Sequence, residues 1–174
     1  MRSYESFTVI EGTFVLFKGS QSPLSNFYRK IFYNSEGVRF FTAEHHYQYC
    51  KAIRFKDYRM ARRIVNVRSP LMAKRLGRQI SNFNEFTWST IKKNVMYETL
   101  KLKFQNRSMK NELRRFYLMS GSNRKRTFIE YSDNDTYWGA RLIDNDAAIN
   151  YQNLQGQNQM GRILTRIASE LFDD

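Results

Sequence analysis

Apolar residues recur at helical spacing along three stretches in the second half of the chain. In the first, they stand at positions 88, 91, 95 and 102, which predicts a long helix ending near Gln105. A second stretch, 109–117, has the same period and is stopped by Gly121. In the third, the apolar face consists of Ile163, Leu164, Ile167 and Leu171, with Asn158 as a candidate N-cap. This half is therefore expected to be mostly helical.

Three further helices are predicted in the first half of the chain. Two cover residues 43–54 and 57–65, and the second of these is basic. A third helix begins after Ser69, with Pro70 at its first position and Gly77 beyond its end.

Extended segments are fewer and shorter. Strands are predicted over 13–17 and 127–131, and the segments 30–33 and 38–41 flank a turn that joins them as a hairpin. No internal repeat and no linker interrupts the pattern. The sequence therefore predicts an α+β fold, with one compact domain over residues 1–174 that is mostly helical and contains a small sheet.

The composition is that of a globular chain. Of the 174 residues, 41% are hydrophobic and 16% aromatic, enough for one sizeable core. No apolar run approaches membrane-spanning length, and residues 1–6 lack an apolar signal segment. Cys50 is the only cysteine, so a disulfide within the chain is impossible. This fits a reducing compartment, and we expect a cytoplasmic protein in which Cys50 packs inside a helix.

The chain has a large excess of positive charge. It contains 29 Lys and Arg against 16 Asp and Glu, a net charge of +13. Such a surface attracts polyanions and phosphorylated ligands, but it also serves simply to keep a protein soluble. No helix-turn-helix, zinc-finger or ribonucleoprotein motif is present, so any nucleic-acid contact is expected to involve backbone phosphates.

The most informative polar position is Glu44. Thr42 is a candidate N-cap, which places Glu44 in the first helical turn, where the helix dipole favours a charged carboxylate. Gln48 lies four residues on and Lys51 seven residues on, so both share a helix face with Glu44. A carboxylate beside an amide and a cation suits sugar or nucleotide chemistry, although most acids in a first turn only complement the dipole.

A second polar cluster lies in the loop after the strand predicted over 127–131. Asp135 comes three residues before Trp138 and Gly139. Tryptophan stacks on bases and sugars, and glycine lets the backbone approach a ligand closely. Asp133, in the same loop, is expected to make an Asx turn.

Short segments in a fixed order extend over nearly the whole chain. They are 25–27, 42–48, 69–70, 77–78, Trp88 with Lys92, 95–96, 103–104, 130–139 and 156–161. Each is weak alone, but the ordered set is specific. In this order they resemble the NADAR family, the YbiA-like domains named for a proposed link to NAD and ADP-ribose.

The resemblance implies a YbiA-like fold and a hydrolase acting on N-glycosidic bonds. Family activities include removal of ADP-ribose from guanine in nucleic acids and cleavage of ribosylamino pyrimidine phosphates, which are riboflavin-pathway intermediates. Both reactions pass through an oxocarbenium-like state that a carboxylate stabilises. Glu44 and Asp135 are the expected catalytic residues. Glu44 is expected to stabilise charge or orient water, and Asp135 either to orient ribose hydroxyls or to assist the leaving group.

The expected substrate contacts come from the same matched segments and their neighbours. They are Asn26, Phe27, His45, Gln48, Lys51, Arg78, Trp88, Trp138, Gly139 and Asn158. Phe27 and Trp88 suit the core as well as a pocket. His45 suits a hydrogen bond in the core, and Asn158 suits either a helix cap or a pocket wall.

No metal site and no cofactor are expected. His45 and His46 are adjacent, so they point to different sides of a helix, and one cysteine adds little to them as ligands. Lys51 and Arg78 are candidates for substrate phosphate. The expected partner is a nucleotide or ADP-ribose-containing substrate, with nucleic acid contacted through phosphates. Neither a membrane nor an obligate protein partner is inferred.

The chain departs from the family pattern after Gly139, where Arg141 stands near the usual position of another glycine. Residues 142–155, which include Asp144 and Asp146, are longer than in compact bacterial members. This bears on the choice of substrate, and the charge slightly favours a nucleic-acid-linked one. Two other functions stay open: a module that binds ADP-ribose or NAD without turnover, and a basic nucleic-acid-associated protein with a vestigial pocket.

Overall fold

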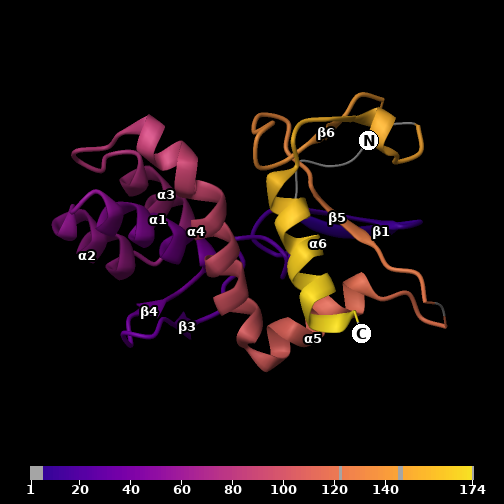
Figure 1. The fold of residues 1–174 in the computed structure, drawn as a ribbon, viewed down its shortest axis with the longest axis horizontal. Coiled ribbons are helices and arrows are strands. Elements are labelled where there is room, and N and C mark those ends of the chain that lie inside the picture. Colours follow the sequence, from indigo (N-terminus) through magenta and orange to yellow (C-terminus); the bar gives the residue numbers. More distant parts are fainter. Residues whose placement is uncertain (1–5, 122, 145–146, 174) are drawn as a thin grey trace. The chain divides into compact units, whose positions relative to one another are not determined.

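The computed structural model describes residues 6–121, 123–144 and 147–173 (Figure 1). Asp146 and residues 1–5 lie outside the described residues. In chain order the elements are β1 (Phe7–Glu11), β2 (Phe14–Lys18), β3 (Phe32–Tyr33), β4 (Arg39–Phe40), α1 (Ala43–Arg54), α2 (Tyr58–Asn66), α3 (Pro70–Gly77), α4 (Glu85–Gln105), α5 (Arg107–Tyr117), β5 (Thr127–Glu130), β6 (Arg141–Leu142), the 3₁₀ turn η1 (Tyr151–Asn153), β7 (Leu154–Gln155) and α6 (Gln159–Phe172). Helices dominate and the sheets are small, so the predicted α+β class is confirmed.

Backbone contacts divide the chain into two units. One is continuous, Asn26–Asn106, and the other combines Met1–Ser25 with Arg107–Asp174. The continuous unit is thus inserted between β2 and α5 of the discontinuous one. Grouping by contacts does not test whether the units fold as one domain, so the single-domain prediction stays a prediction.

The continuous unit is built around α1, which contacts α2, α3 and α4. Helix α1 has the predicted bounds, and its residues 43–48 are all buried. The predicted hairpin is also present, with Phe32 opposite Phe40 across β3 and β4. Phe40 packs edge-on against the His46 ring at 4.8 Å, which ties the hairpin to α1.

The discontinuous unit is a three-stranded sheet in the order β1-β2-β5, with α6 packed on β5. Strand β1 is antiparallel to β2, and β2 runs parallel to β5 with Phe14 opposite Thr127. Leu16 and Ile129 face one core cluster, whereas Phe128 stacks on Tyr117 at 6.3 Å. The sheet is therefore covered on both faces, as continuous apolar runs in β2 and β5 require.

The structure adds elements that the sequence pattern did not predict. Strand β1 was missed because its apolar residues Val9 and Ile10 are adjacent. Both are exposed, so apolar and polar residues do not alternate as they do in a half-buried strand. The two-residue strands β6 and β7 are too short to leave a pattern. Gly77 was predicted to lie beyond α3 but is its last helical residue.

None of the helices that the structure describes combines sufficient length with sufficient apolar character to cross a membrane.

Lys103 is buried in α4 of the continuous unit and has no exposed surface. Its ammonium group lies 5.9 Å from the centre of the Tyr28 ring. Burial lowers the pKa of Lys103 to about 7, against about 10.4 in an unfolded chain. Between these two values the unfolded chain binds a proton that the folded chain does not. Lys103 therefore makes the free energy of unfolding rise with pH across this window.

We expect Lys103→Met to remove this contribution. Urea unfolding between about pH 7 and pH 10 should then show a smaller rise in the free energy of unfolding than wild type does. The exposed Lys101→Met is the matched control on the same helix and should keep the wild-type slope. Equal slopes for all three proteins would contradict a depressed pKa at Lys103.

Candidate functional site

The first turn of α1 is capped as predicted and places Glu44 inside the protein. Thr42 has extended backbone angles, and its Oγ1 accepts a hydrogen bond from the His45 N–H. The Glu44 N–H donates to the Asn26 carbonyl at 3.0 Å, so a backbone donor of the helix start is satisfied from outside the helix. Glu44 is only 6% exposed, which is unusual for an acid that merely complements a helix dipole.

Gln48 fixes the Glu44 side chain. The Gln48 Nε2 donates to Glu44 Oε1 at 2.8 Å, and both residues are buried. This confirms that the two share a helix face. A hydrogen bond to a charged acceptor is strong and favours the ionised carboxylate.

Lys51 lies on the same side, one turn further along α1. Its ammonium donates to the Gly77 carbonyl at 3.0 Å and lies 4.1 Å from the centre of the Phe83 ring. Burial lowers the pKa of Lys51, while Glu85 and Glu44 oppose this shift and Arg78 adds to it. Lys51 is therefore close enough to Glu44 for their charges to interact. Its role toward phosphate stays a prediction.

Gly77 sits against the Gln48 amide. A Cβ added at Gly77 would collide with Gln48 Oε1, so any side chain at this position must displace the Gln48 amide. Among the described residues, no group donates a hydrogen bond to Gln48 Oε1 or to Asn26 Oδ1, although both atoms are buried. Such acceptors are normally satisfied, so a water molecule or a ligand donor is expected beside them.

Three other predicted contacts of this unit have different surroundings. Arg78 is exposed at the C-cap of α3. Trp88 is 5% exposed and packs on Tyr47 at 5.4 Å, as its core alternative required. Phe27 is half-buried, with the Lys74 ammonium 5.9 Å from its ring centre.

The two histidines serve the packing of α1. His45 Nε2 lies 2.9 Å from the Val67 carbonyl and Nδ1 lies 2.8 Å from Thr42 Oγ1, so both nitrogens have protein partners. His46 Nδ1 bonds Thr99 Oγ1 at 2.8 Å. Burial lowers the pKa of both residues, that of His46 to about 4, which keeps the rings neutral at physiological pH.

Within the described part of the chain, no three His, Cys, Asp or Glu side chains gather in a way that could hold a metal ion.

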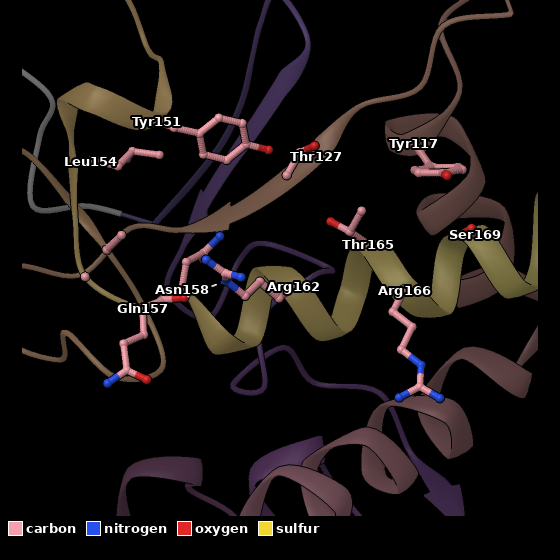
Figure 2. Close-up of a pocket in the computed structure, with 12 residues that line it drawn as sticks. Tyr117, Thr127, Tyr151, Leu154, Gln157, Asn158, Arg162, Thr165, Arg166 and Ser169 are labelled. Atoms are coloured by element: carbon pink, nitrogen blue, oxygen red, sulfur yellow. Dashed lines mark hydrogen bonds between the residues drawn. The ribbon is translucent and has the colours of Figure 1, made fainter.

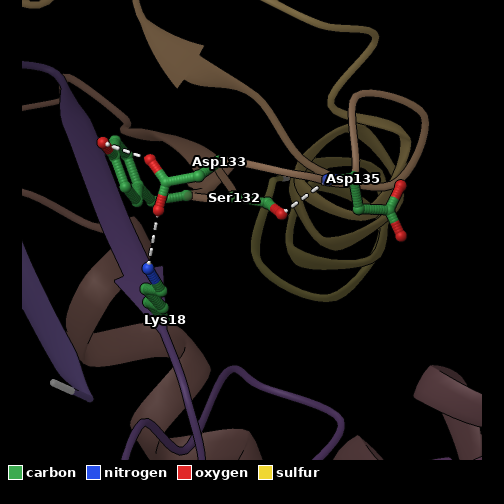
Figure 3. Close-up of polar contacts among 5 residues, drawn as sticks. Lys18, Ser132, Asp133 and Asp135 are labelled. Atoms are coloured by element: carbon green, nitrogen blue, oxygen red, sulfur yellow. Dashed lines mark hydrogen bonds and ion pairs between the residues drawn. The ribbon is translucent and has the colours of Figure 1, made fainter. Parts of the chain in front are cut away.

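In the acidic loop of the discontinuous unit, residues 132–139, the two aspartates make different contacts (Figure 3). Asp133 forms an ion pair with Lys18 at 3.1 Å and accepts a bond from the Tyr131 hydroxyl. The hydrogen bond from Lys18 lowers the pKa of Asp133. The Asx turn predicted for Asp133 belongs to Asp135 instead, whose Oδ1 accepts from the backbone N–H groups of residues 137 and 138. The prediction failed because both aspartates suit such a turn and only tertiary contacts choose between them.

Asp135 is oriented by this turn. Its own N–H donates to Ser132 Oγ at 2.9 Å, and Figure 3 shows its carboxylate pointing away from Asp133 and Lys18. Among the described residues, Oδ2 of Asp135 has no hydrogen-bond donor. The side chain thus orders the loop with one oxygen, and its role toward a substrate stays a prediction.

The loop is joined to the start of α6 by four backbone hydrogen bonds. Residues 157–160 donate to the carbonyls of residues 136, 139, 137 and 138, in that order, at 2.7–3.1 Å. Gly139 is needed here because a Cβ would lie 2.8 Å from the Glu130 carbonyl oxygen. Gly139 therefore lets another part of the chain itself approach its backbone closely. Trp138 is half-buried, with its ring edge-on to Tyr137 at 5.0 Å.

Asn158 occupies the N-cap position of α6 but makes no side-chain cap bond. Its amide instead bonds the backbone of β5, with Oδ1 accepting from the Glu130 N–H and Nδ2 donating to the Phe128 carbonyl. The residue has a left-handed backbone, φ 48°, which asparagine tolerates better than most residues. It also lines a cavity, which agrees with the pocket-wall alternative.

Sequence reasoning missed two residues that organise these clusters. Gly77 was noted only as a matched residue and a helix end, and its partner Gln48 is 29 positions away in the sequence numbering. Ser132 left no signal, because serine in a polar loop is common. In both cases the contact depends on tertiary placement.

The chain was compared with known proteins. The NMR structure of the E. coli protein YbiA matches it with a TM-score of 0.67 and 26% identity, over 94% of this chain and 87% of that one. N-glycosidase YbiA of Shigella boydii is 30% identical over 136 residues, which cover 78% of this chain and 73% of that protein. A riboflavin biosynthesis protein of Vibrio vulnificus is 28% identical over 149 residues, 85% of this chain and 35% of that protein.

The structural match assigns the chain to the YbiA-like α+β proteins, which confirms the predicted fold. The NADAR domain profile matches residues 14–172. The chain therefore belongs to the NADAR domain family, and its relatives include N-glycosidases.

The contact between Gly77 and Gln48 yields a test of the site. Alanine normally stabilises a helix relative to glycine. Here we expect Gly77→Ala to lower the free energy of unfolding by about 1–3 kcal/mol, because the added methyl group must displace the Gln48 amide. Urea unfolding measures the change.

A double variant separates this contact from other effects. Gln48→Ala removes the colliding atoms, so Gly77→Ala should cost much less in that background. A Gly77→Ala protein at least as stable as wild type would rule out the contact.

Proposed function

We propose that this protein is an N-glycosidase that hydrolyses the bond between an anomeric carbon and a nitrogen in an ADP-ribosyl or ribosylamino nucleotide. The observation that carries the proposal is the buried Glu44 carboxylate, oriented by Gln48 at the N-terminus of α1. The protein belongs to the NADAR domain family and has N-glycosidase relatives, which supports the same reaction class.

Glu44 acts on the charge that develops during cleavage. As the C–N bond breaks, positive charge builds up on the sugar, and a fixed carboxylate stabilises it without having to reorganise. The bond from Gln48 and the helix N-terminus favour the ionised form, whereas burial opposes it. Glu44 therefore suits stabilising the cation or orienting the attacking water better than donating a proton. Water supplies its oxygen to the anomeric carbon and a proton to the departing nitrogen.

The preferred substrate is ADP-ribose attached to guanine in nucleic acid. The net charge of +13 favours a polyanionic substrate over a small one. The alternative substrate, a ribosylamino pyrimidine phosphate, is favoured by the similarity to the riboflavin biosynthesis protein. A non-catalytic ADP-ribose- or NAD-binding module would have no need for a buried, oriented carboxylate, and so is third.

A product assay distinguishes these functions. The protein is incubated separately with an ADP-ribosylated guanine oligonucleotide and with ribosylamino pyrimidine phosphates, and the released base or sugar is quantified. At low salt, we expect release from the oligonucleotide to be faster than release from the ribosylamino pyrimidine phosphates. Faster release from the pyrimidine would reverse the order of the substrates, and binding without release from either would identify a binding module.

We expect Glu44→Gln to lower turnover by about a hundredfold or more, because it removes the negative charge that stabilises the cationic transition state. The substitution is nearly isosteric, and its carbonyl oxygen still accepts from Gln48. The control Glu98→Gln removes an exposed acid from α4 and should leave turnover unchanged. Near-wild-type turnover in a folded Glu44→Gln protein would exclude Glu44 from the mechanism.

Asp135→Asn tests the second predicted acid. The asparagine oxygen can still accept from residues 137 and 138, so thermal stability should change little. If Asp135 acts on the substrate, turnover should fall at least about tenfold, as expected for loss of a general acid–base or orienting group. Unchanged turnover would leave Asp135 only its role in ordering the loop.

A further inference from the structure

The discontinuous unit contains a cavity of about 700 Å³, a volume typical of small-molecule sites. It lies beside α6, and the segment of η1 and β7 contributes to its wall (Figure 2). The residues that line it include Tyr151, Gln157 and Arg162. None of the described residues that line it is acidic, whereas two are arginines. A cavity of this charge selects anions.

Arg162 supplies a positioned cation. Its Nε donates to the Gln157 carbonyl at 2.9 Å, which holds the guanidinium near the first turn of α6. Among the described residues, its two terminal nitrogens have no hydrogen-bond acceptor. These two donors form the planar pair that binds phosphate oxygens well. Arg166 lies at the rim, where it pairs with Glu170 and in Figure 2 extends away from Tyr151.

The α6 helix start does not itself provide the anion site. The N–H groups of Gln159 and Met160 already donate to the carbonyls of Tyr137 and Trp138. An anion in this cavity would therefore depend on the Arg162 side chain, and removal of that side chain is a clean test.

Tyr151 supplies an aromatic surface. It is 69% exposed, yet its ring is held edge-on against Phe14 at 5.5 Å. An exposed ring with a fixed orientation is suited to stacking on a nucleobase. Tyr151 belongs to the segment 142–155, which is the part of the chain that departs from the family pattern.

We propose that this cavity binds one nucleotide unit, with its phosphate on the Arg162 guanidinium and its base on the Tyr151 ring. The site is separate from the Glu44 cluster in its residues and needs no bond cleavage. The nucleotide can be free or part of a single strand, because both present the same phosphate and base.

Binding is measured by fluorescence anisotropy with a labelled, unmodified single-stranded oligonucleotide at low salt. This probe has no ADP-ribosyl bond, so failure of the glycosidase proposal would not affect the result. We expect Arg162→Gln to weaken binding about tenfold, as for loss of a charge-assisted contact. Arg115→Gln, which removes the same charge from an exposed position on α5, should weaken it twofold or less.

Tyr151→Leu should weaken binding about tenfold, whereas Tyr151→Phe, which keeps the ring, should bind as wild type does. Competition with unlabelled adenosine monophosphate identifies the source of the nucleotide. Displacement of the probe supports a site for a single nucleotide, and no displacement, with the Arg162 effect retained, supports a site for a strand. Equal weakening by Arg162→Gln and Arg115→Gln would overturn the proposal, because only net charge would then matter. Loss of binding in Tyr151→Phe would equally exclude stacking.

Discussion

The beginning of α1 lies inside the protein, so each polar group there needs a partner from another part of its unit. The Asn26 carbonyl accepts from the Glu44 N–H, and the Val67 carbonyl accepts from the His45 ring. In the last turn of the same helix, the Lys51 ammonium donates to the Gly77 carbonyl. An unsatisfied buried polar group costs about 1–3 kcal/mol. The segments that carry the Asn26 and Val67 carbonyls are therefore held against the start of α1, and the end of α3 is held against its last turn. The buried Glu44 carboxylate is in turn held by the hydrogen bond from Gln48.

In the discontinuous unit, polar groups are held mainly by backbone hydrogen bonds rather than by side chains. Four backbone hydrogen bonds from residues 157–160 hold its acidic loop on the start of α6. Gly139 and Gly156 permit this close packing, since a Cβ on Gly156 would lie 2.6 Å from the Gly139 carbonyl oxygen. A short polar loop thereby gains a defined shape without a hydrophobic core of its own.

The parts of the structure that could be predicted are those governed by local chemistry. Thr42 caps α1 because a hydroxyl at that position satisfies a helix N–H, and this needs no knowledge of the fold. Glu44 and Gln48 were expected on one face because helical geometry alone puts them there. The remainder depends on contacts that sequence spacing does not encode. The Asx turn expected of Asp133 is made by Asp135 instead, because Lys18, 115 positions away in the sequence, pairs with Asp133. Asn158 bonds β5 instead of capping α6 for the same reason.

The insertion of one unit between β2 and α5 sets an order on synthesis. All contacts within Asn26–Asn106 become available once that stretch has left the ribosome. Strand β2 by then has been made but has no parallel partner, because β5 begins only at Thr127. The acidic loop can form its backbone hydrogen bonds only later, because their donors are residues 157–160. A truncation that removes the chain from Gln157 onward would therefore disturb the conformation of Asp135, although that residue lies 22 positions earlier.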